Sequence, residues 1–513
     1  MLLRRVGRSR IGRGSWRGTT VVAAVFALAA PTAATAAGPQ PGTPEYVQRD
    51  QQNQSDAYGR QTAPDGQLGN PAYAPAAVAE GNEVGLSQLA QQAATPNHVA
   101  LTPGNVFPGW NMGNPLRRGW TGRRGIRTAV SWTNRYGALI RGDVFAPLPG
   151  AKDPYTGRRL KPPYPGVVIT TGSIQGSERM YWWLAEDLAE RGYVVITYDV
   201  QGQGTSETLP HENDQVNALP FCNPFAQPQQ GEEFGCPGVP AQQASNFVFG
   251  TRDALSFLLS TPSKRYPNKN ADTPVNSFNP YWNLLDRRKD RQTATKGRTS
   301  KVAIIGHSLG AFAVSYVQAV DKRVETVVAL DKLASKGQSG IADLPKFKPV
   351  IPALAVQSEY GFNVYPYWMS HGSSISPQPG PPDQGPDPKR EELTGFDAWR
   401  NAKVDTMLIV PRASTHLEYT DISYALPASR YGQDLTSVYV QRWLDQYLKH
   451  RRTDLRAGSF KYLEPVDVGK WAPKTLQRKS LLSFYYCSGY AFRPDGRHVR
   501  TNLHIGGVGG CKK

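Results

Sequence analysis

The chain has 513 residues and a formal net charge of +18 at neutral pH, with 59 lysines and arginines against 41 acidic residues. Its length exceeds the usual size of one domain, but one large domain with insertions also fits, so length alone does not require two cores. A basic surface favours nucleic acid, an anionic polymer or an acidic substrate. The positive charges are scattered, however, apart from two short runs at 287–291 and 449–452. We interpret these runs as solvated faces and expect no nucleic-acid partner.

The first 37 residues predict an export signal. Six arginines precede an apolar run from Val21 to Ala30, and small residues follow through Ala37. The run is shorter than the roughly 20 residues that span a bilayer, and Ala34-Thr-Ala36 offers a small-x-small cleavage site. We therefore expect residues 1–36 to be a signal peptide and the mature chain to be secreted, extracellular and without a transmembrane segment. Its net charge falls from +18 to +12, because the signal holds six arginines and no acidic residue.

Four cysteines in an exported chain predict disulfides, because the compartment is oxidising and no spacing typical of a metal site is present. Three pairings are formally possible. Cys222 and Cys236 bracket one loop, while Cys487 and Cys511 bracket the tail. We favour the pairs Cys222–Cys236 and Cys487–Cys511, each of which would stabilise a short loop by roughly 2–4 kcal/mol.

Residues 37–110 are rich in Gln, Ala, Pro, Gly and Asn and show no periodic aliphatic pattern. Such a segment cannot bury enough apolar surface to offset the cost of ordering, so we expect it to be of low complexity and largely disordered. Order is expected to begin with a β-hairpin. Its strands, 128–132 and 138–145, flank the glycine-containing turn Asn134-Arg-Tyr-Gly137.

From residue 164 onward, short β-branched runs alternate with helical patterns, which is typical of βαβ units that build a parallel sheet. Strands are predicted at 167–171, 193–198, 302–305, 324–330, 351–356 and 406–410. Helices are predicted between Ser177 and Gly192 and near 244–260, 310–319 and 437–449. A catalytic domain is therefore expected at 111–455, followed by a C-terminal extension at 456–513.

Three stretches interrupt this alternation, at 201–242, 262–298 and 361–402. Loops this long inside a compact domain are usually functional or mobile. Two interpretations of these loops stay open. They form a lid or a wall of a substrate site, or they are plain surface insertions. Trp182 and Trp183 could also line a site, although helical spacing favours core packing for Trp183.

The segment Gly306-His-Ser-Leu-Gly310 matches the pattern G-x-S-x-G in an informative context. A predicted strand precedes it, and the residues that follow it are typical of a helix. A serine on such a tight strand-to-helix turn needs small residues two positions before and after it, because larger side chains would clash with the neighbouring backbone. Ser308 is therefore the predicted nucleophile, with a fortuitous glycine-rich turn as the alternative.

At this point the chain resembles the α/β-hydrolase superfamily over roughly residues 125–450, and within it secreted esterases and lipases that include cutinase-like polyester hydrolases and dienelactone-hydrolase relatives. Besides the serine motif, similar segments are Pro165–Gly172, Gly192–Asp199 and the loop Asp199-Val-Gln-Gly-Gln-Gly-Thr-Ser206. The resemblance implies an α/β-hydrolase fold, with a mostly parallel sheet of about eight strands flanked by helices and long insertions. It also implies an oxyanion hole formed by the backbone N–H groups of Ser173 and Leu309.

A serine hydroxyl is a poor nucleophile unless a base takes its proton. Of the eight histidines, His416 follows the predicted strand 406–410 and precedes the last long helix, where the superfamily keeps its base. His371, in the proline-rich insertion, is the alternative. His307 is expected to be a structural neighbour of the serine.

The acidic residue that completes a Ser-His-acid triad departs from the family pattern. Most relatives carry the acid just beyond strand seven, at a position that falls on Gly361 here. Asp331, after the strand 324–330, and Glu359, after the strand 351–356, remain as candidates. Asp331 is favoured because pancreatic-type lipases place their acid similarly. A cap or loop anchor is the other interpretation of either residue.

These residues predict acyl transfer through a serine ester, in which His416 deprotonates Ser308 and water completes hydrolysis without a cofactor or metal. The expected partner is an ester substrate, as a lipid, a polymer surface or a small molecule. An exported acyltransferase of the cell envelope, a peptidase or amidase, and a non-catalytic binding protein on the same scaffold are the alternatives.

Overall fold

The computed structural model describes residues 42–95, 112–173, 177–208, 240–290, 301–331, 333–334, 346–361, 364, 371–372, 377–378, 395–421, 430–483, 485–486, 488–493 and 500–502. The chain divides into the units Met1–Ala37 and Gly38–Lys513, and all described residues belong to the second. The expected export signal and all four cysteines, with both predicted disulfides, lie outside the described residues. No described helix is long and apolar enough to cross a membrane.

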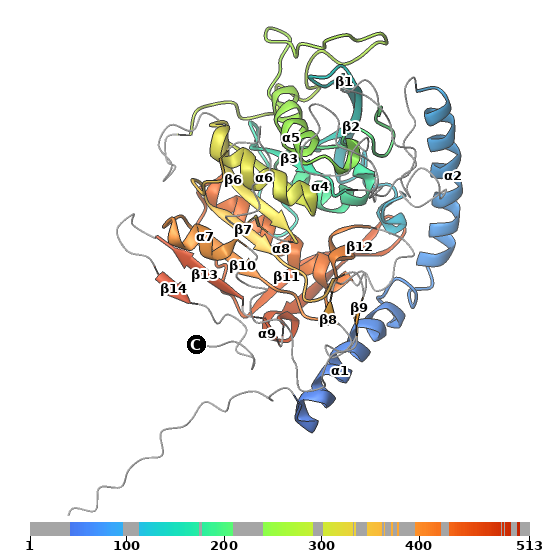
Figure 1. Ribbon diagram of the computed structural model, residues 1–513. Helices are drawn as coiled ribbons and strands as arrows, with labels where there is room; N and C mark the ends of the chain where they lie inside the picture. The colour runs from blue at the N-terminus through green and yellow to red at the C-terminus, as the bar shows by residue number, and fades with distance from the viewer. Residues whose placement is uncertain are drawn as a thin grey trace, which may run out of the picture. The chain divides into compact units, whose positions relative to one another are not determined.

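A ten-stranded sheet forms the centre of the second unit (Figure 1), in the order β1-β2-β4-β3-β5-β6-β7-β10-β13-β14. Its strands are β1 (Gly125–Thr133), β2 (Leu139–Pro147), β3 (Gly166–Thr170), β4 (Val194–Tyr198), β5 (Val302–His307), β6 (Val324–Leu330), β7 (Ala353–Val356), β10 (Thr406–Ile409), β13 (Gly489–Phe492) and β14 (Arg500–Asn502). Neighbours from β4 to β10 pair in parallel, and the pairs at both ends of the sheet are antiparallel. The predicted fold class is confirmed, because the eight strands from β1 to β10 in this order follow the strand order of the α/β-hydrolase fold.

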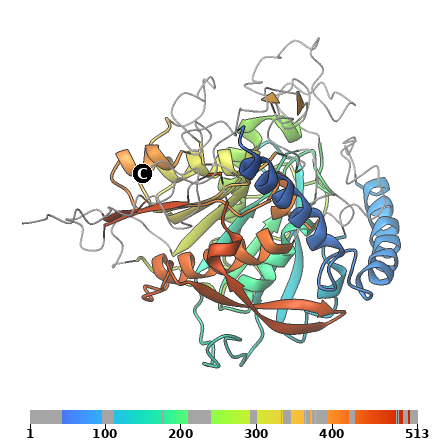
Figure 2. The ribbon, with the colours of Figure 1, turned by 90° about the horizontal axis from the view of Figure 1, so that it is seen from below.

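Helices cover both faces of this sheet (Figure 2), which explains why every residue of its central strands is buried. Along β3, Val168 packs with α5 (Ala244–Leu258) and α6 (Leu309–Val320), whereas Val167 and Ile169 belong to the opposite core with α4 (Trp182–Ala189) and α8 (Arg430–Tyr447). This alternation follows from the two-residue period of a strand.

The N-terminal segment contains two helices, α1 (Pro44–Thr62) and α2 (Tyr73–Ala93), where the sequence predicts disorder. Thr43 caps α1, because its hydroxyl accepts a hydrogen bond from the N–H of Tyr46, and the helix buries Asp50, Asn53 and Gln61. The low aliphatic content of this segment predicts disorder, but α1 is ordered by buried polar side chains, of which Asp50 and Asn53 form hydrogen bonds to residues far away in the chain.

The predicted C-terminal extension belongs to the same core as residues 111–455. β11 (Ser459–Asp467) and β12 (Lys470–Gln477) form a hairpin against α8, which buries Phe460 and Tyr462, and β13 pairs with β10. The sheet therefore exceeds the predicted eight strands. The remaining elements are η1 (Pro115–Arg117), η2 (Glu178–Tyr181), η3 (Pro240–Gln242), β8 (His371–Gly372), β9 (Pro377–Gln378), α7 (Phe396–Asn401), η6 (His416–Tyr419) and α9 (Arg478–Leu481).

Candidate active site

Ser308, Asp331 and His416 lie beyond the carboxyl ends of three parallel strands. Ser308 follows β5 directly, Asp331 follows β6 directly, and His416 begins η6 after β10. Parallel strands end at one edge of a sheet, which is the edge where open α/β sheets bind their ligands. The topology therefore brings residues that lie up to 108 positions apart to the same edge.

Ser308 occupies a strained turn between β5 and α6, with φ 54° and ψ −119°. A Cβ atom on Gly306 would lie 2.1 Å from the carbonyl oxygen of Gly310. A Cβ atom on Gly310 would lie 2.5 Å from the carbonyl oxygen of Thr171. Both glycines are therefore required for the close approach of backbone segments that presents the half-buried Ser308.

Asp331 and His416 form a direct pair, in which Asp331 Oδ2 accepts a hydrogen bond from His416 Nδ1. The other carboxylate oxygen accepts from the backbone N–H and the hydroxyl of Ser358, at 2.8 and 2.6 Å. The backbone N–H of His416 donates to the carbonyl oxygen of Gly361 at 2.6 Å. With its proton on Nδ1, a neutral imidazole has Nε2 as its acceptor, which is the state that a general base requires.

Glu359, the alternative acid, lies in a different network. Its carboxylate accepts hydrogen bonds from Asn53 Nδ2 at 2.7 Å, from the hydroxyl of Ser483 and from the backbone N–H of Ala413. The side chain is completely buried, and burial raises its pKa above the usual value. Glu359 thus connects α1, the loop after β10 and the C-terminal region, and it is Asp331 that bonds to His416.

His307 supports the strand-to-helix turn at Ser308 through a chain of hydrogen bonds. The N–H of Gly172 donates to the Tyr181 hydroxyl at 2.9 Å, and this hydroxyl donates to His307 Nδ1 at 2.7 Å, because the other ring nitrogen of the neutral imidazole must carry the proton that bonds to a carbonyl oxygen. His307 Nε2 then carries the proton that it donates to the carbonyl oxygen of His416 at 2.9 Å. Burial lowers the pKa of His307 to about 3, so the ring is neutral and acts as a fixed support.

The two expected oxyanion donors flank Ser308. Leu309 is the first residue of α6, and the N–H groups of the first helical turn have no acceptor within their helix. Ser173 follows Gly172, at which a Cβ atom would lie 3.3 Å from the Cβ of Ser308. Gln203 Nε2 donates to the Gly172 carbonyl at 2.9 Å and so fixes the orientation of this loop.

Sequence reasoning missed three supporting residues, Tyr181, Gln203 and Ser358. Each contacts a partner that lies 27 or more positions away in the chain, except for the short link between Tyr181 and Gly172. Gln203 belongs to the loop that resembles a superfamily motif, and that motif is the only signal that pointed toward it. The structure of that loop also depends on Gly204, where a Cβ atom would lie 2.2 Å from the Asp199 carboxylate.

His371, the alternative base, begins the two-residue strand β8, which pairs with β9 in a separate small sheet. The structure therefore gives it no place on the main sheet. Among the described residues, no group of three or more His, Cys, Asp or Glu side chains is arranged to hold a metal ion.

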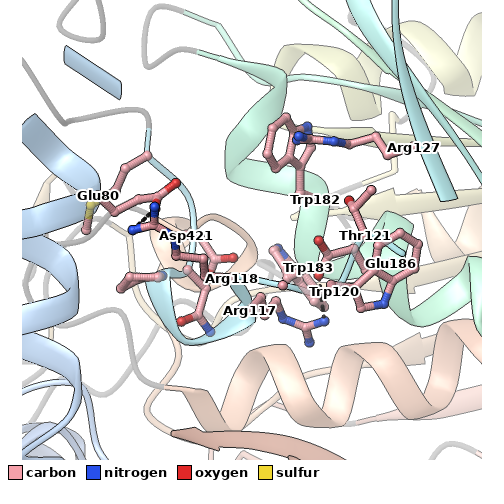
Figure 3. A pocket seen from close by; sticks show the side chains of 14 residues that line it. Glu80, Arg117, Arg118, Trp120, Thr121, Arg127, Trp182, Trp183, Glu186 and Asp421 are labelled. Atoms are coloured by element: carbon pink, nitrogen blue, oxygen red, sulfur yellow. Dashed lines mark hydrogen bonds and ion pairs between the residues drawn. The ribbon is translucent and has the colours of Figure 1, made fainter. Parts of the chain in front are cut away.

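Trp182 and Trp183 line a cavity of 180 Å³ whose walls include neither Ser308 nor His416 (Figure 3). Trp183 is 1% exposed and donates to the carbonyl oxygen of Tyr419, as its core spacing predicts. Arg127 lies 3.8 Å from the centre of the Trp182 ring. The tryptophan pair therefore faces a cavity other than the site around Ser308.

Comparisons with known proteins add little to this geometry. No protein-family model and no curated protein matches the chain. Among solved structures, the chain is similar to a ferulic acid esterase from Streptomyces cinnamoneus, with 15% sequence identity and a TM-score of 0.37, over 64% of this chain and 91% of that chain. A likeness this distant carries no argument about activity or substrate.

Proposed function

We propose that the chain is a serine hydrolase that cleaves carboxylic esters, with Ser308 as nucleophile, His416 as general base and Asp331 as the acid that orients it. The observation that carries this proposal is the hydrogen bond between Asp331 and His416, at the sheet edge where Ser308 occupies its positive-φ turn. A nucleophile, a base and an orienting carboxylate are the parts that acyl transfer requires.

In the proposed mechanism, His416 Nε2 takes the proton of the Ser308 hydroxyl while the serine oxygen attacks the ester carbonyl. Asp331 stabilises the imidazolium that forms. The N–H groups of Leu309 and Ser173 bind the oxyanion, and each such donor typically lowers the barrier by about 3 kcal/mol. His416 then returns the proton to the leaving alcohol, and water attacks the acyl-enzyme by the same route.

We also propose that the protein acts outside the cell, on the basis of the export signal predicted at 1–36 and the predicted disulfides Cys222–Cys236 and Cys487–Cys511. The substrate class is a carboxylic ester of a lipid, a polymer or a small molecule.

The test is hydrolysis of nitrophenyl esters with short and long acyl chains by the purified protein. Replacing Ser308→Ala should lower kcat by at least about 10³-fold, because the nucleophile is lost while the fold is kept. Ser263→Ala, at an exposed residue of another loop, is the matched control and should keep full activity. Hydrolysis that survives Ser308→Ala, or its absence with every chain length, would contradict the proposal.

A further inference from the structure

The two basic runs of the sequence lie side by side in the structure. The first follows Leu285, which bridges to Tyr164 just before β3, and the second follows α8. A hydrogen bond of 2.6 Å between His450 Nε2 and Asp290 Oδ2 joins the two runs. The described part of the first run, residues 287–290, therefore contacts the second run, and the two are not independent solvated faces.

A cavity of 320 Å³ opens beside the second run, and cationic side chains dominate its walls. These are Arg158, Arg159, Lys161, Arg191, Lys449 and Arg451, with Asp153 as the one acidic residue that lines it. We call these six cations, together with Arg287, Lys289 and Arg452 of the two runs, the cationic surface.

Two of the six cations, Arg191 and Lys449, are largely buried and are held in place by ion pairs. Arg191 pairs with Asp153 at 3.0 Å and with Asp445 at 2.5 Å, and Lys449 pairs with Asp445 at 2.9 Å. Their side chains are 11% and 10% exposed. Burial also lowers the pKa of Lys449 to about 8. Two carboxylates thus neutralise the inner cations and hold them in place.

The outer cations are not neutralised in this way. Arg158, Arg159 and Lys161 are exposed and have no ion pair among the described residues, and the nearest carboxylate oxygen to Arg451 lies 4.0 Å away. Arg287, Lys289 and Arg452 are likewise exposed, without an ion pair in the described part of the chain. Like charges gathered around a concave surface focus the field and attract an anion.

The cationic surface lies at the sheet edge opposite the candidate active site. Pro165 and Gly192, which line the cavity, come just before the first residues of β3 and β4, whereas Ser308 follows the last residue of β5. A five-residue strand is roughly 17 Å long. Substitutions at this surface are therefore remote from Ser308.

We propose that the cationic surface binds a linear polymer that carries phosphate groups, with one phosphate in the cavity and its neighbours along the two basic runs. Guanidinium groups pair with phosphate oxygens in a bidentate way, and four of the six cavity cations are arginines. A polymer fits better than a single ion because the cations extend beyond the cavity. This inference does not depend on the proposed ester hydrolysis.

Two other anionic partners fit the surface less well. The exposed large apolar side chains of the described residues belong to α1, α2 and the loop between them, to the end of α6 and to the β11–β12 hairpin, so none would insert into a membrane from this face. Single-stranded nucleic acid binds through aromatic platforms. In the described part of the chain, the only exposed aromatic among these side chains is Tyr58 of α1.

The test measures binding of long-chain inorganic polyphosphate to the full mature chain at near-physiological salt. The variant Arg158→Gln, Arg159→Gln, Lys161→Gln should bind at least about tenfold more weakly, because three exposed cations are removed from one field. The matched control, Lys269→Gln, Lys346→Gln, Lys403→Gln, removes the same charge from exposed positions that do not line the cavity. It should bind within about twofold of the unmodified protein.

Other outcomes would overturn the proposal. These are no binding of polyphosphate, equal loss in both triple variants, tighter binding of single-stranded DNA than of polyphosphate at equal charge, or binding only to vesicles that contain phosphatidylglycerol. Ser308→Ala should bind polyphosphate normally, and the triple variant should hydrolyse nitrophenyl esters normally. Failure of this proposal is thereby distinguishable from failure of the proposed hydrolase activity.

Discussion

At the scale of single residues, Ser308 and Asp331 share an uncommon backbone conformation, with φ values of 54° and 60°. Non-glycine residues in the left-handed region cost of order 1–3 kcal/mol each. Each follows the last residue of a strand, and neighbouring strands hold its N–H group. Ser308 donates to Leu330 at 3.1 Å, and Asp331 donates to Val356 at 2.7 Å. Sheet pairing thus holds two strained residues at one edge.

The Tyr181 hydroxyl should be a positioning group for the whole site, because it joins Gly172 to His307 and, through His307, to His416. Tyr181→Phe leaves a buried N–H and a ring nitrogen without this partner. We expect kcat to fall by about ten- to a hundredfold through misalignment, with little change in KM.

Steady-state kinetics on a small ester would measure kcat and KM separately. Tyr281→Phe is the control, since it removes a hydroxyl that bonds to Thr128 of β1 at 2.7 Å and takes no part in the chain from Gly172 to His416. Unchanged kcat in the folded Tyr181→Phe protein would show that the hydrogen-bond chain does not position the site.

Glu178 should make stability depend on pH. Burial raises its pKa well above the usual value, with further contributions from Asp143 and Asp199. Folded Glu178 keeps a proton that the unfolded chain releases, so this group's stabilisation is complete below its ordinary pKa and is lost as pH rises through the raised value. Glu178→Gln retains an oxygen to accept from Trp182 and Thr197 and cannot ionise.

Denaturant unfolding across pH would measure the effect. Glu178→Gln should unfold like the unmodified protein at about pH 4 and be the more stable of the two at about pH 8. Parallel stability curves for the two proteins would contradict the raised pKa.

At the scale of elements, α1 is anchored by polar contacts rather than by an apolar stripe. Asn53 is fully buried, donates to Glu359 at 2.7 Å and to Tyr360 at 3.0 Å, and accepts from Arg412 at 3.0 Å. The substitution Asn53→Ala removes one hydrogen-bond partner from each of Glu359, Tyr360 and Arg412. We expect the free energy of unfolding to fall by about 2–3 kcal/mol.

Chemical denaturation would check this value. Gln51→Ala, at an exposed position of the same helix, is the control and should change stability by less than about 0.5 kcal/mol. Equal small effects of both substitutions would mean that α1 contributes little to the folded state.

Elements with a strong local pattern were predictable. The strand β6 was predicted at the residues it occupies, and β5 and α6 were predicted within two residues because glycines and a change of periodicity mark their boundary. α1 and the strands after residue 456 were not predicted. Their partners are distant in sequence, as the 306 positions between Asn53 and Glu359 illustrate, and no local window contains that information.

The candidate site was predictable to a similar degree. Ser308 and His416 follow from a motif and from chain order, whereas the choice between Asp331 and Glu359 did not follow from the sequence. Both carboxylates come soon after a buried strand. Which one reaches His416 depends on the positive φ of Asp331 and on Ser358, and neither leaves a pattern in the chain.

At the scale of the whole described unit, the C-terminal region completes the core instead of forming an appendage. Tyr462 is buried against Arg117 and Asp187, and Leu476 and Tyr490 also belong to the core that contains α8. A chain truncated after residue 455 should therefore fail to fold, because several large buried side chains lose their partners.

Circular dichroism and thermal unfolding would check the truncation. A second truncation after residue 502, beyond β14, serves as the control: it removes the predicted Cys487–Cys511 pair but keeps every described strand, and it should retain a cooperative transition. A cooperative transition in the shorter chain would mean that 456–513 is a separate extension, as the sequence alone suggests.

Two sites lie at opposite ends of the parallel strands in this unit. The candidate active site occupies the edge where the strands end, and the cationic surface occupies the edge where they begin. If Asp331 orients His416, its replacement should impair Ser308 far more than replacement of Glu359, the other candidate carboxylate.

The measurement is the rate at which a fluorophosphonate probe labels Ser308, with the adduct located by peptide mass spectrometry. Asp331→Asn should slow labelling by roughly 10³–10⁴-fold, because His416 loses the partner that fixes its tautomer. Glu359→Gln, at the other buried carboxylate, should label within about tenfold of the unmodified rate when folded, since its contacts are structural. Rapid labelling of Asp331→Asn, or slow labelling only of Glu359→Gln, would contradict the account.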